Sequence, residues 1–187
     1  WEGEHVNHIG TQQLTTKRLN LRRLELEDFH SMFNNWASDE KVAKYTTWYA
    51  HQSEKTTQEY LKMIVHSYDQ LDYYCWGIEY QENLVGMISV IPVDEKADIC
   101  GIGYVLSRNY WNLGLMTEAA DAVITFLCKE VEYRRVIAWC DVANTASNLV
   151  LRKVGMRLEG KLRQHIARKD STYGDEHIYG ILKEEIG

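Results

Sequence analysis

Residues 99–128 read ICGIGYVLSRNYWNLGLMTEAADAVITFLC, and this stretch carries the most information about the fold. Its first part, Ile99–Leu106, is mostly apolar and predicts a buried strand. From Met116 to Val131, apolar residues recur at steps of three and four over four turns, which is the spacing of an amphipathic helix. Arg135–Cys140 predicts a second strand. The segment is therefore expected to form a strand–helix–strand unit with two parallel strands.

The elements on either side of this unit complete a mixed α/β pattern. Further strands are predicted at 18–24, 74–80, 84–91, 158–167 and 176–182, and further helices at 26–36, 53–68 and 144–153. Pro92 should end the strand before it, because proline has no backbone N–H for a sheet ladder. The fold class is therefore α/β, with six or seven strands and about four helices.

Length and composition indicate one globular domain. The chain has 187 residues, of which 45% are hydrophobic and 26% charged, enough for a single well-buried core. Residues 1–13 are polar and lack periodicity, so we expect a flexible N-terminal arm before a domain at 14–187. No apolar run approaches the ~18 residues that a membrane span needs, and the first residues do not resemble a secretory signal.

Charge and cysteine content restrict the partners. The 21 Lys and Arg against 27 Asp and Glu give a net charge of −6, which disfavours a general binder of nucleic acid or anionic membranes. The four cysteines form no Cys-x-x-Cys pair or zinc spacing, and the seven histidines show no metal-ligand spacing, so no metal site is expected. Each cysteine lies in an apolar stretch, which indicates reduced thiols in the core of a cytoplasmic protein.

The loop between strand 99–106 and the helix that follows is a candidate anion site. The first amides of a helix have no intrahelical acceptor, and the helix dipole places partial positive charge there. Gly114 would let the backbone approach a phosphate closely. No Gly-Lys-Ser/Thr follows and no Gly-x-Gly-x-x-Gly is present, so this is neither a Walker loop nor a dinucleotide fingerprint. On these residues alone, an ordinary strand-to-helix turn is the favoured interpretation.

Four motifs in order raise a specific resemblance. The run Ile102–Glu118 resembles the fourth strand and pyrophosphate loop of the GNAT superfamily of acetyl-CoA-dependent N-acetyltransferases. Thr16–Arg22 is similar to the opening strand of that family, and Asn144–Asn148, with Gly155 eleven residues beyond Asn144, to its Asn-x-x-Ser helix. Leu158–Gly160 and Asp175–Tyr179 resemble its closing strands. The resemblance covers nearly the whole chain from about Thr15 and is nearest to the Rim-type branch, which contains the ribosomal-protein alanine N-acetyltransferases.

The resemblance implies a single GNAT-type domain and a co-substrate, acetyl-CoA. Its central sheet would be mixed and mostly antiparallel, with parallel strands four and five splayed apart so that acetyl-CoA enters the gap. The pantetheine arm would pair with the edge of the fourth strand like an added strand, and the diphosphate would lie on the loop amides. The implied cofactor-binding residues are Tyr104, Val105, Leu106, Asn112, Leu113, Gly114, Leu115, Met116, Thr117 and Asn144.

The resemblance also implies how catalysis would work. The backbone N–H near Val105 would stabilise the oxyanion, and Ser147 would protonate the leaving thiolate, although a serine one turn into a helix often only caps or packs. Two familiar catalytic groups are missing, because Gly101 stands where many relatives have a glutamate and Leu151 where many have a tyrosine. A water held by a carboxylate could serve as base, and the candidates are Glu79, Asp98 and Asp141.

The predicted function is transfer of acetyl from acetyl-CoA to a primary amine by direct attack in a ternary complex. A chain α-amine has a pKa of about 7.7–8.0, so neutralising it at pH 7 costs about 1–1.4 kcal/mol, against about 4.6 kcal/mol for a lysine amine. A site without an obvious strong base therefore favours a protein N-terminal α-amine over lysine. Two alternatives stay open: a non-catalytic acyl-CoA-binding or regulatory module, and a nucleotide-phosphate enzyme that uses the same loop. The relatives also suggest a homodimer.

Overall fold

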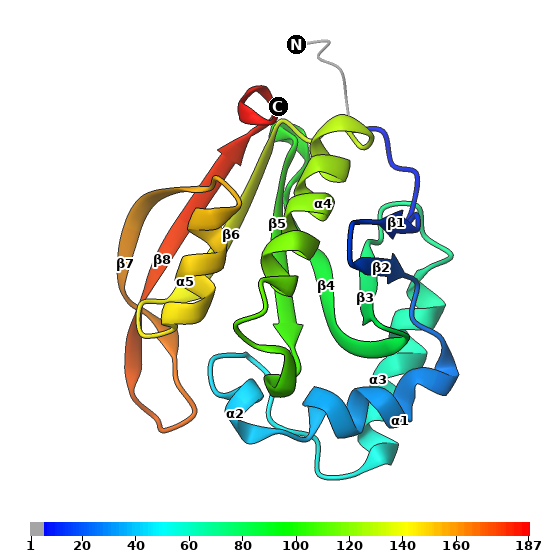
Figure 1. The fold of residues 1–187 in the computed structure, drawn as a ribbon. Coiled ribbons are helices and arrows are strands. Elements are labelled where there is room, and N and C mark those ends of the chain that lie inside the picture. The colour runs from blue at the N-terminus through cyan, green and yellow to red at the C-terminus, as the bar shows by residue number, and fades with distance from the viewer. Residues whose placement is uncertain (1–5) are drawn as a thin grey trace. The chain divides into compact units, whose positions relative to one another are not determined.

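The computed structural model describes residues 6–187, and over these residues the chain forms one eight-stranded mixed sheet with five α-helices (Figure 1). The strands are β1 (Leu14–Thr15), β2 (Leu19–Arg22), β3 (Cys75–Tyr80), β4 (Asn83–Asp94), β5 (Ile99–Leu106), β6 (Arg135–Asp141), β7 (Arg157–Ala167) and β8 (Tyr173–Leu182). The α-helices are α1 (Phe29–Met32), α2 (Glu40–Ala43), α3 (Glu54–Ser67), α4 (Leu115–Lys129) and α5 (Thr145–Lys153). Short 3-10 helices are η1 (Leu26–Asp28), η3 (Glu95–Ala97), η4 (Arg108–Tyr110) and η5 (Lys183–Glu185), and η2 (Phe33–Ala37) is a π-helical turn.

The chain divides into two compact units. Of the described residues, the loop unit contains His8–Val90 and Gly103–Ala122, and the hairpin unit contains residues 6–7, Ile91–Ile102 and Val123–Gly187. Three elements, β4, β5 and α4, contribute residues to both units. Within the loop unit the strands follow the order β1-β2-β3-β4-β5, and within the hairpin unit the order β4-β5-β6-β8-β7.

The loop unit packs helices against an antiparallel sheet. Strand β3 pairs with β2 on one side and β4 on the other, and Gln81 and Glu82 form the β3–β4 turn with positive φ angles of 49° and 64°. Figure 1 shows α1 and α3 side by side, and their apolar faces share one core with β3 and β4. The buried members of this core are Leu24, Met32, Trp36, Ala37, Val42, Leu61, Ile64, Tyr68, Cys75, Leu84 and Met87.

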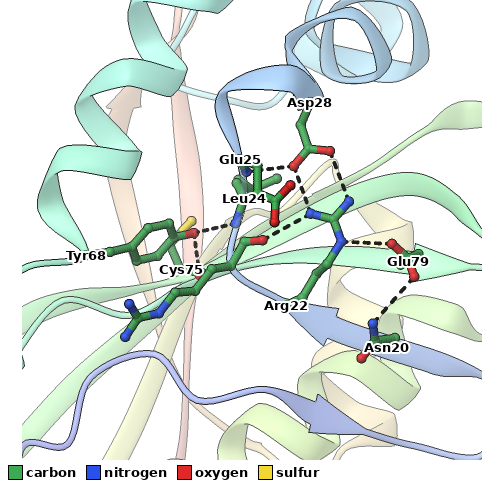
Figure 2. A network of polar contacts seen from close by, with 9 residues as sticks. Asn20, Arg22, Leu24, Glu25, Asp28, Tyr68, Cys75 and Glu79 are labelled. Atoms are coloured by element: carbon green, nitrogen blue, oxygen red, sulfur yellow. Dashed lines mark hydrogen bonds and ion pairs between the residues drawn. The ribbon is translucent and has the colours of Figure 1, made fainter.

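Polar contacts fix the chain where β2 leads into η1 (Figure 2). The Arg22 guanidinium donates from Nη1 and Nη2 to the carboxylate of Asp28 at 2.8 and 3.0 Å, and from Nε to Oε2 of Glu79 at 2.8 Å. The backbone N–H of Leu24 donates to the hydroxyl of Tyr68 on α3 at 2.9 Å. These bonds tie the first helical segment to β3 and α3, so the helices of this unit have a defined position on its sheet.

The hairpin unit is built on the predicted parallel pair, which is confirmed. Ile99–Gly101 of β5 lies in parallel register with Arg135–Ile137 of β6. Strand β8 then pairs antiparallel with β6 over its whole length, from Arg135↔Leu182 to Asp141↔Glu176. Strand β7 is the last strand in the order and pairs antiparallel with β8. Helix α5 packs on β6 and β7, while the opening of a gap beyond the parallel register stays a prediction.

Most predicted elements are found, with some corrections. The helical segment predicted at 26–36 is present but changes from 3-10 through α to π geometry. There are eight strands rather than six or seven over residues 6–187, partly because the two-residue β1 was not predicted; the short α2 was also missed. The prediction that Pro92 ends its strand is wrong, since β4 continues to Asp94. Residues 91–94 are exposed, and a proline can be accommodated in a strand where its missing N–H would face solvent.

Part of the predicted N-terminal arm is attached to the loop unit. Thr11 is 3% exposed, and its hydroxyl donates to the carbonyl of Tyr73 at 3.0 Å and accepts from the N–H of Cys75 at 3.1 Å. The carbonyl of Gln12 accepts from the indole N–H of Trp76 at 2.6 Å. Residues 1–5 lie outside the described residues, and the boundary between an arm and a domain at residue 14 stays a prediction.

Candidate functional site

The segment Ser107–Thr117, called the anion loop from here on, connects β5 to α4 within the loop unit. Its start is held by the N–H of Ser107, which donates to the carbonyl of Val85 on β4 at 2.7 Å. One turn of 3-10 helix follows, and then the backbone enters the left-handed region twice, at Asn112 with φ 61° and at Gly114 with φ 75°. Asn and Gly are the residues that adopt this conformation at least cost, so the sequence determines the shape of the loop locally.

The loop presents a row of unpaired backbone donors. Among the described residues, none of the six amides from Asn112 to Thr117 donates to a protein acceptor, and residues 111–114 are exposed. The 15-residue helix α4 begins at Leu115, so its positive end faces the same place. Free N–H groups next to left-handed residues form a concave donor surface that favours anions. This geometry supports the predicted role of residues 112–117, which stays a prediction.

Side chains anchor the anion loop to the rest of the loop unit. The indole Nε1 of Trp111 donates to the carbonyl of Leu106 at 2.9 Å, and Nε of Arg108 donates to Oδ2 of Asp39 at 2.9 Å. Trp111 stands where the family motif has Gln or Arg, and it contributes a hydrogen bond to the end of β5 instead. The sequence analysis did not predict this hydrogen bond. The available signal was the indole N–H, which can donate a hydrogen bond but cannot accept one.

The predicted strand edge, Tyr104–Leu106, lies directly before the anion loop and is half-buried. A Cβ on Gly86 of β4 would collide with the Val105 carbonyl and lie 3.1 Å from Cα of Leu106, so glycine is needed for this close approach. The Leu106 carbonyl already accepts from Trp111, but a carbonyl oxygen has two lone pairs and can accept again. Pairing of this edge with a pantetheine arm and the oxyanion role of the Val105 N–H stay predictions.

In the hairpin unit, Asn144 and Ser147 meet at the start of α5. Oδ1 of Asn144 accepts from the N–H of Ser147 at 3.2 Å, so Asn144 is the N-cap, and its Nδ2 has no protein acceptor among the described residues. Burial raises the pKa of the Cys140 thiol to about 11, although its hydrogen bond with Ser147 acts in the opposite direction. Ser147 is thus engaged in the fold, and its proposed proton transfer stays a prediction.

Asn148 organises the hairpin unit around α5, which the sequence analysis missed. Its Nδ2 donates to the carbonyls of Asp141 and Asn144 at 3.1 and 2.8 Å, and its Oδ1 accepts from Tyr179 Oη at 2.8 Å and contacts His177 Nδ1 at 2.7 Å. Since Oδ1 can only accept, Nδ1 of His177 carries the proton and Nε2 is its free acceptor when the ring is neutral. The four-residue spacing between Asn144 and Asn148 was the available signal, because it places both on one helix face.

A shallow pocket of about 350 Å³ lies beside the same helix. Its lining comes from one face of α5 together with β8 and the end of β6: Val142, Thr145, Asn148, Leu149, Arg152 and His177. Arg152 and His177 contribute the two basic side chains of this lining.

Two of the carboxylates considered as holders of a catalytic water are occupied. Both oxygens of Asp141 accept from Arg168 at 2.7 Å, and this pairing is the largest cause that holds the pKa of Asp141 below its usual value. Glu79 is paired with Arg22 (Figure 2). Asp98 lies before β5, and its Oδ1 is buried without a hydrogen-bond partner in the described part of the chain. A carboxylate whose pKa is lowered by arginine is a weak base, so Asp141 is a poor candidate. Both oxygens of Glu79 already accept hydrogen bonds, from Arg22 and Asn20.

The structure explains why two familiar catalytic side chains are absent. A Cβ on Gly101 would lie 2.9 Å from Cζ3 of Trp139 on β6, so Trp139 occupies the space that a glutamate would need. Leu151, at the usual tyrosine position, is 1% exposed and belongs to the core. Both positions therefore lie in packed regions of the hairpin unit.

Residues 6–187 contain neither a metal-binding cluster nor a membrane-spanning helix. No cluster of three or more His, Cys, Asp or Glu side chains could hold a metal ion. No helix in this part of the chain combines the length and apolar character needed to cross a membrane.

Comparison with known proteins identifies relatives. The family model described as acetyltransferase (GNAT) domain matches residues 18–157. An uncharacterised N-acetyltransferase of Bacillus subtilis (strain 168), YnaD, is 32% identical over 92% of this chain and 98% of its own length. The ribosomal-protein-serine acetyltransferase of Escherichia coli (strain K12) is 30% identical over 54% of this chain and 58% of its own. A solved structure of RimL, described as a ribosomal L7/L12 alpha-N-protein acetyltransferase in complex with coenzyme A, has the same fold with a TM-score of 0.83, at 20% identity over 91% of this chain and 98% of that chain.

Proposed function

Since the chain belongs to the GNAT family of acetyl-CoA-dependent N-acetyltransferases, we propose that it moves the acetyl group directly to the N-terminal α-amine of a protein or peptide. The amine nitrogen attacks the thioester carbonyl carbon, a C–N bond forms, and the C–S bond breaks. The amine loses one proton, and the leaving thiolate takes one up. No covalent enzyme intermediate is needed, because no cysteine or serine of residues 6–187 lies beside a recognisable activating base.

The observation that carries the cofactor part of this proposal is the anion loop. Six backbone amides without protein acceptors, from Asn112 to Thr117, can donate to the diphosphate of coenzyme A. The edge of Tyr104–Leu106 would align the pantetheine arm, and the free Nδ2 of Asn144 would donate to it. The Val105 N–H would stabilise the oxyanion, a contribution of about 3 kcal/mol for one such donor. Ser147 would protonate the thiolate.

The choice of an α-amine rests on the absence of a strong base. A glutamate at position 101 would clash with Trp139, Leu151 stands where many relatives have a tyrosine, and the ionised carboxylate of Asp141 is paired with Arg168. Neutralising an α-amine at pH 7 costs about 3 kcal/mol less than neutralising a lysine amine. Two proteins named above, the Escherichia coli enzyme and RimL, are ribosomal-protein acetyltransferases, which supports a protein acceptor.

The test is release of coenzyme A thiol from acetyl-CoA with a panel of amines at pH 7. The panel contains short peptides with free N-termini, the same peptides with acetylated N-termini, Nα-acetyl-lysine and spermidine. We expect turnover on free N-termini and loss of turnover when they are blocked. For lysine side chains, kcat/KM should be lower by about two to three orders of magnitude, because the neutral fraction of a lysine amine at pH 7 is smaller than that of an α-amine by that factor. Equal or faster turnover on lysine or spermidine contradicts the choice of acceptor.

One specific observation favours a second candidate, a non-catalytic acyl-CoA-binding module. Gly101 and Leu151 remove two catalytic groups, and two of the carboxylates considered are paired with arginines. The same assay separates the candidates, because such a module binds acetyl-CoA without turning it over on any amine.

The proposed enzyme works in the cytoplasm. All four cysteines, at 75, 100, 128 and 140, are free and buried, which suits a reducing compartment.

A homodimer is also proposed, and the mass of the native protein by light scattering tests it.

A further inference from the structure

Arg18 joins the start of β2 to the anion loop, although the two are about 100 residues apart in the chain. Its Nη1 donates to the carbonyl of Leu113 at 2.9 Å. Its Nε donates to Oε2 of Glu118 at 2.7 Å, and its backbone N–H donates to Oε1 of the same residue at 2.8 Å. The guanidinium is therefore fixed in orientation by bonds on two of its three nitrogens.

The third nitrogen, Nη2, lies beside the loop. A Cβ on Gly114 would lie 3.5 Å from Nη2, so Nη2 is on the side of the backbone that glycine leaves open. Among the described residues Nη2 has no acceptor, and the side chain is 37% exposed. A guanidinium held in this way presents charged N–H donors next to the six free amides of residues 112–117.

Glu118 places a negative charge beside the anion loop, which the charge of Arg18 offsets. It lies in the first turn of α4, its side chain is 19% exposed, and it accepts a further hydrogen bond from the hydroxyl of Thr16 at 2.6 Å. Although burial opposes ionisation, the hydrogen bonds from Thr16 and Arg18 hold the pKa of Glu118 below its usual value. An ionised carboxylate beside the loop would repel an anion, and Arg18 offsets that charge.

We propose that Arg18 is a cofactor-binding residue whose Nη2 donates to the diphosphate of coenzyme A, while its other donors hold Leu113 and Glu118 in place. The proposal rests on the proposed use of the anion loop for acetyl-CoA and adds a side chain to the diphosphate contacts, which are otherwise made by backbone amides. A guanidinium suits this position because it bonds the protein and a phosphate at the same time.

The first test compares two acyl donors in the full chain. Acetyl-CoA carries the diphosphate, and acetyl-pantetheine carries the same reacting thioester without it. For Arg18→Gln we expect kcat/KM with acetyl-CoA to fall about tenfold or more through KM, as for loss of one charged hydrogen bond, and kcat/KM with acetyl-pantetheine to stay within threefold of wild type. An equal loss with both donors, or no loss with acetyl-CoA, overturns the proposal.

Two variants supply the controls. Lys17→Gln removes a positive charge from the exposed side chain of the neighbouring residue. It should leave kcat/KM with acetyl-CoA and with acetyl-pantetheine unchanged. Glu118→Gln keeps Arg18 and removes the opposing charge, so CoA affinity should be unchanged or tighter by calorimetry. If Glu118→Gln weakens CoA binding as much as Arg18→Gln does, Arg18 acts only as a clamp, and direct contact with the diphosphate is refuted.

The outcomes also separate this inference from the proposed function. If the wild-type chain gives no calorimetric heat with CoA, the proposed cofactor site is wrong and the role of Arg18 falls with it. If wild type binds CoA and Arg18→Gln binds equally well, only the role of Arg18 is wrong. Should Arg18→Gln fail to fold, Arg18→Lys is measured instead. Its single ammonium cannot serve Leu113, Glu118 and a phosphate together, so CoA affinity should fall at least threefold, and unchanged affinity refutes the role.

Discussion

Replacing Gly114 with valine tests the anion loop at its most sensitive position. Gly114 has φ 75°, a region in which a side chain costs about 1–2 kcal/mol. The new Cβ would lie 3.5 Å from Nη2 of Arg18, an ordinary contact, so backbone strain is the main cost to folding. For a chain of this size the melting temperature should fall by roughly 2–8 °C.

The effect on CoA binding should be larger than the effect on folding. The valine side chain would fill the side of the loop on which the proposed diphosphate lies and would separate it from the amides around residue 114. Loss of one hydrogen bond to a charged group costs about 1.5–3 kcal/mol, so the Kd for CoA should rise about 10- to 150-fold. Isothermal titration calorimetry of the folded variant with CoA, at a temperature below the melting temperature of the variant, measures this change in Kd.

Gly155 provides a matched control for the strain. It has φ 85°, and a Cβ there would lie 3.6 Å from Cδ1 of Ile181, so Gly155→Val introduces nearly the same backbone strain and contact distance. It terminates α5 and has no proposed part in binding. We expect a similar loss in melting temperature with CoA affinity within threefold of wild type. The reasoning fails if Gly114→Val binds CoA normally, or if both variants lose affinity equally.

Two further predictions concern the hairpin unit. Ser147→Ala should lower kcat about 10²-fold while changing the KM for acetyl-CoA little, as expected for loss of a general acid, and steady-state kinetics with an unchanged kcat would mean that water protonates the thiolate. Asp141→Asn should lower the free energy of unfolding at pH 7 by about 2 kcal/mol, because it weakens the charged hydrogen bonds with Arg168. Since the pKa of Asp141 is lowered in the folded state, this stabilisation is present above its unfolded pKa of about 3.9 and is lost as the pH falls through the lowered value. Urea unfolding at several pH values should therefore show the difference shrinking in acid, and a constant difference from pH 7 to pH 3 would refute this.

Features with short-range causes were predicted well. The strand at 99–106 has the predicted bounds, and the helices predicted at 53–68 and 144–153 are present. Ser53 caps the first of them through the N–H of Thr56, and Gly155 ends the second in the left-handed region. Each depends on neighbouring residues only: an apolar run, a hydroxyl acceptor before a helix, and a residue without Cβ. The same holds for the anion loop, whose shape depends on Asn112 and Gly114.

Features that depend on distant partners were not predicted. Nothing near Pro92 in the chain indicates that β4 can pass through it, because that depends on which side of the strand faces solvent. The loss of glutamate at position 101 is visible in the sequence, but its cause, Trp139, lies on another strand. The pairing of Asp141 with Arg168 likewise joins the end of β6 to the turn after β7.

The residues proposed to bind and react with acetyl-CoA illustrate this difference. The unpaired amides of residues 112–117 follow from a helix start preceded by left-handed residues, so a local pattern was enough to propose an anion site. The placement of Arg18 against Leu113 and Glu118, and of Asn148 between two strands, required the folded chain. Backbone geometry is governed by contacts a few residues apart, whereas side chains 30 to 100 residues apart meet only after packing has chosen one arrangement of the elements.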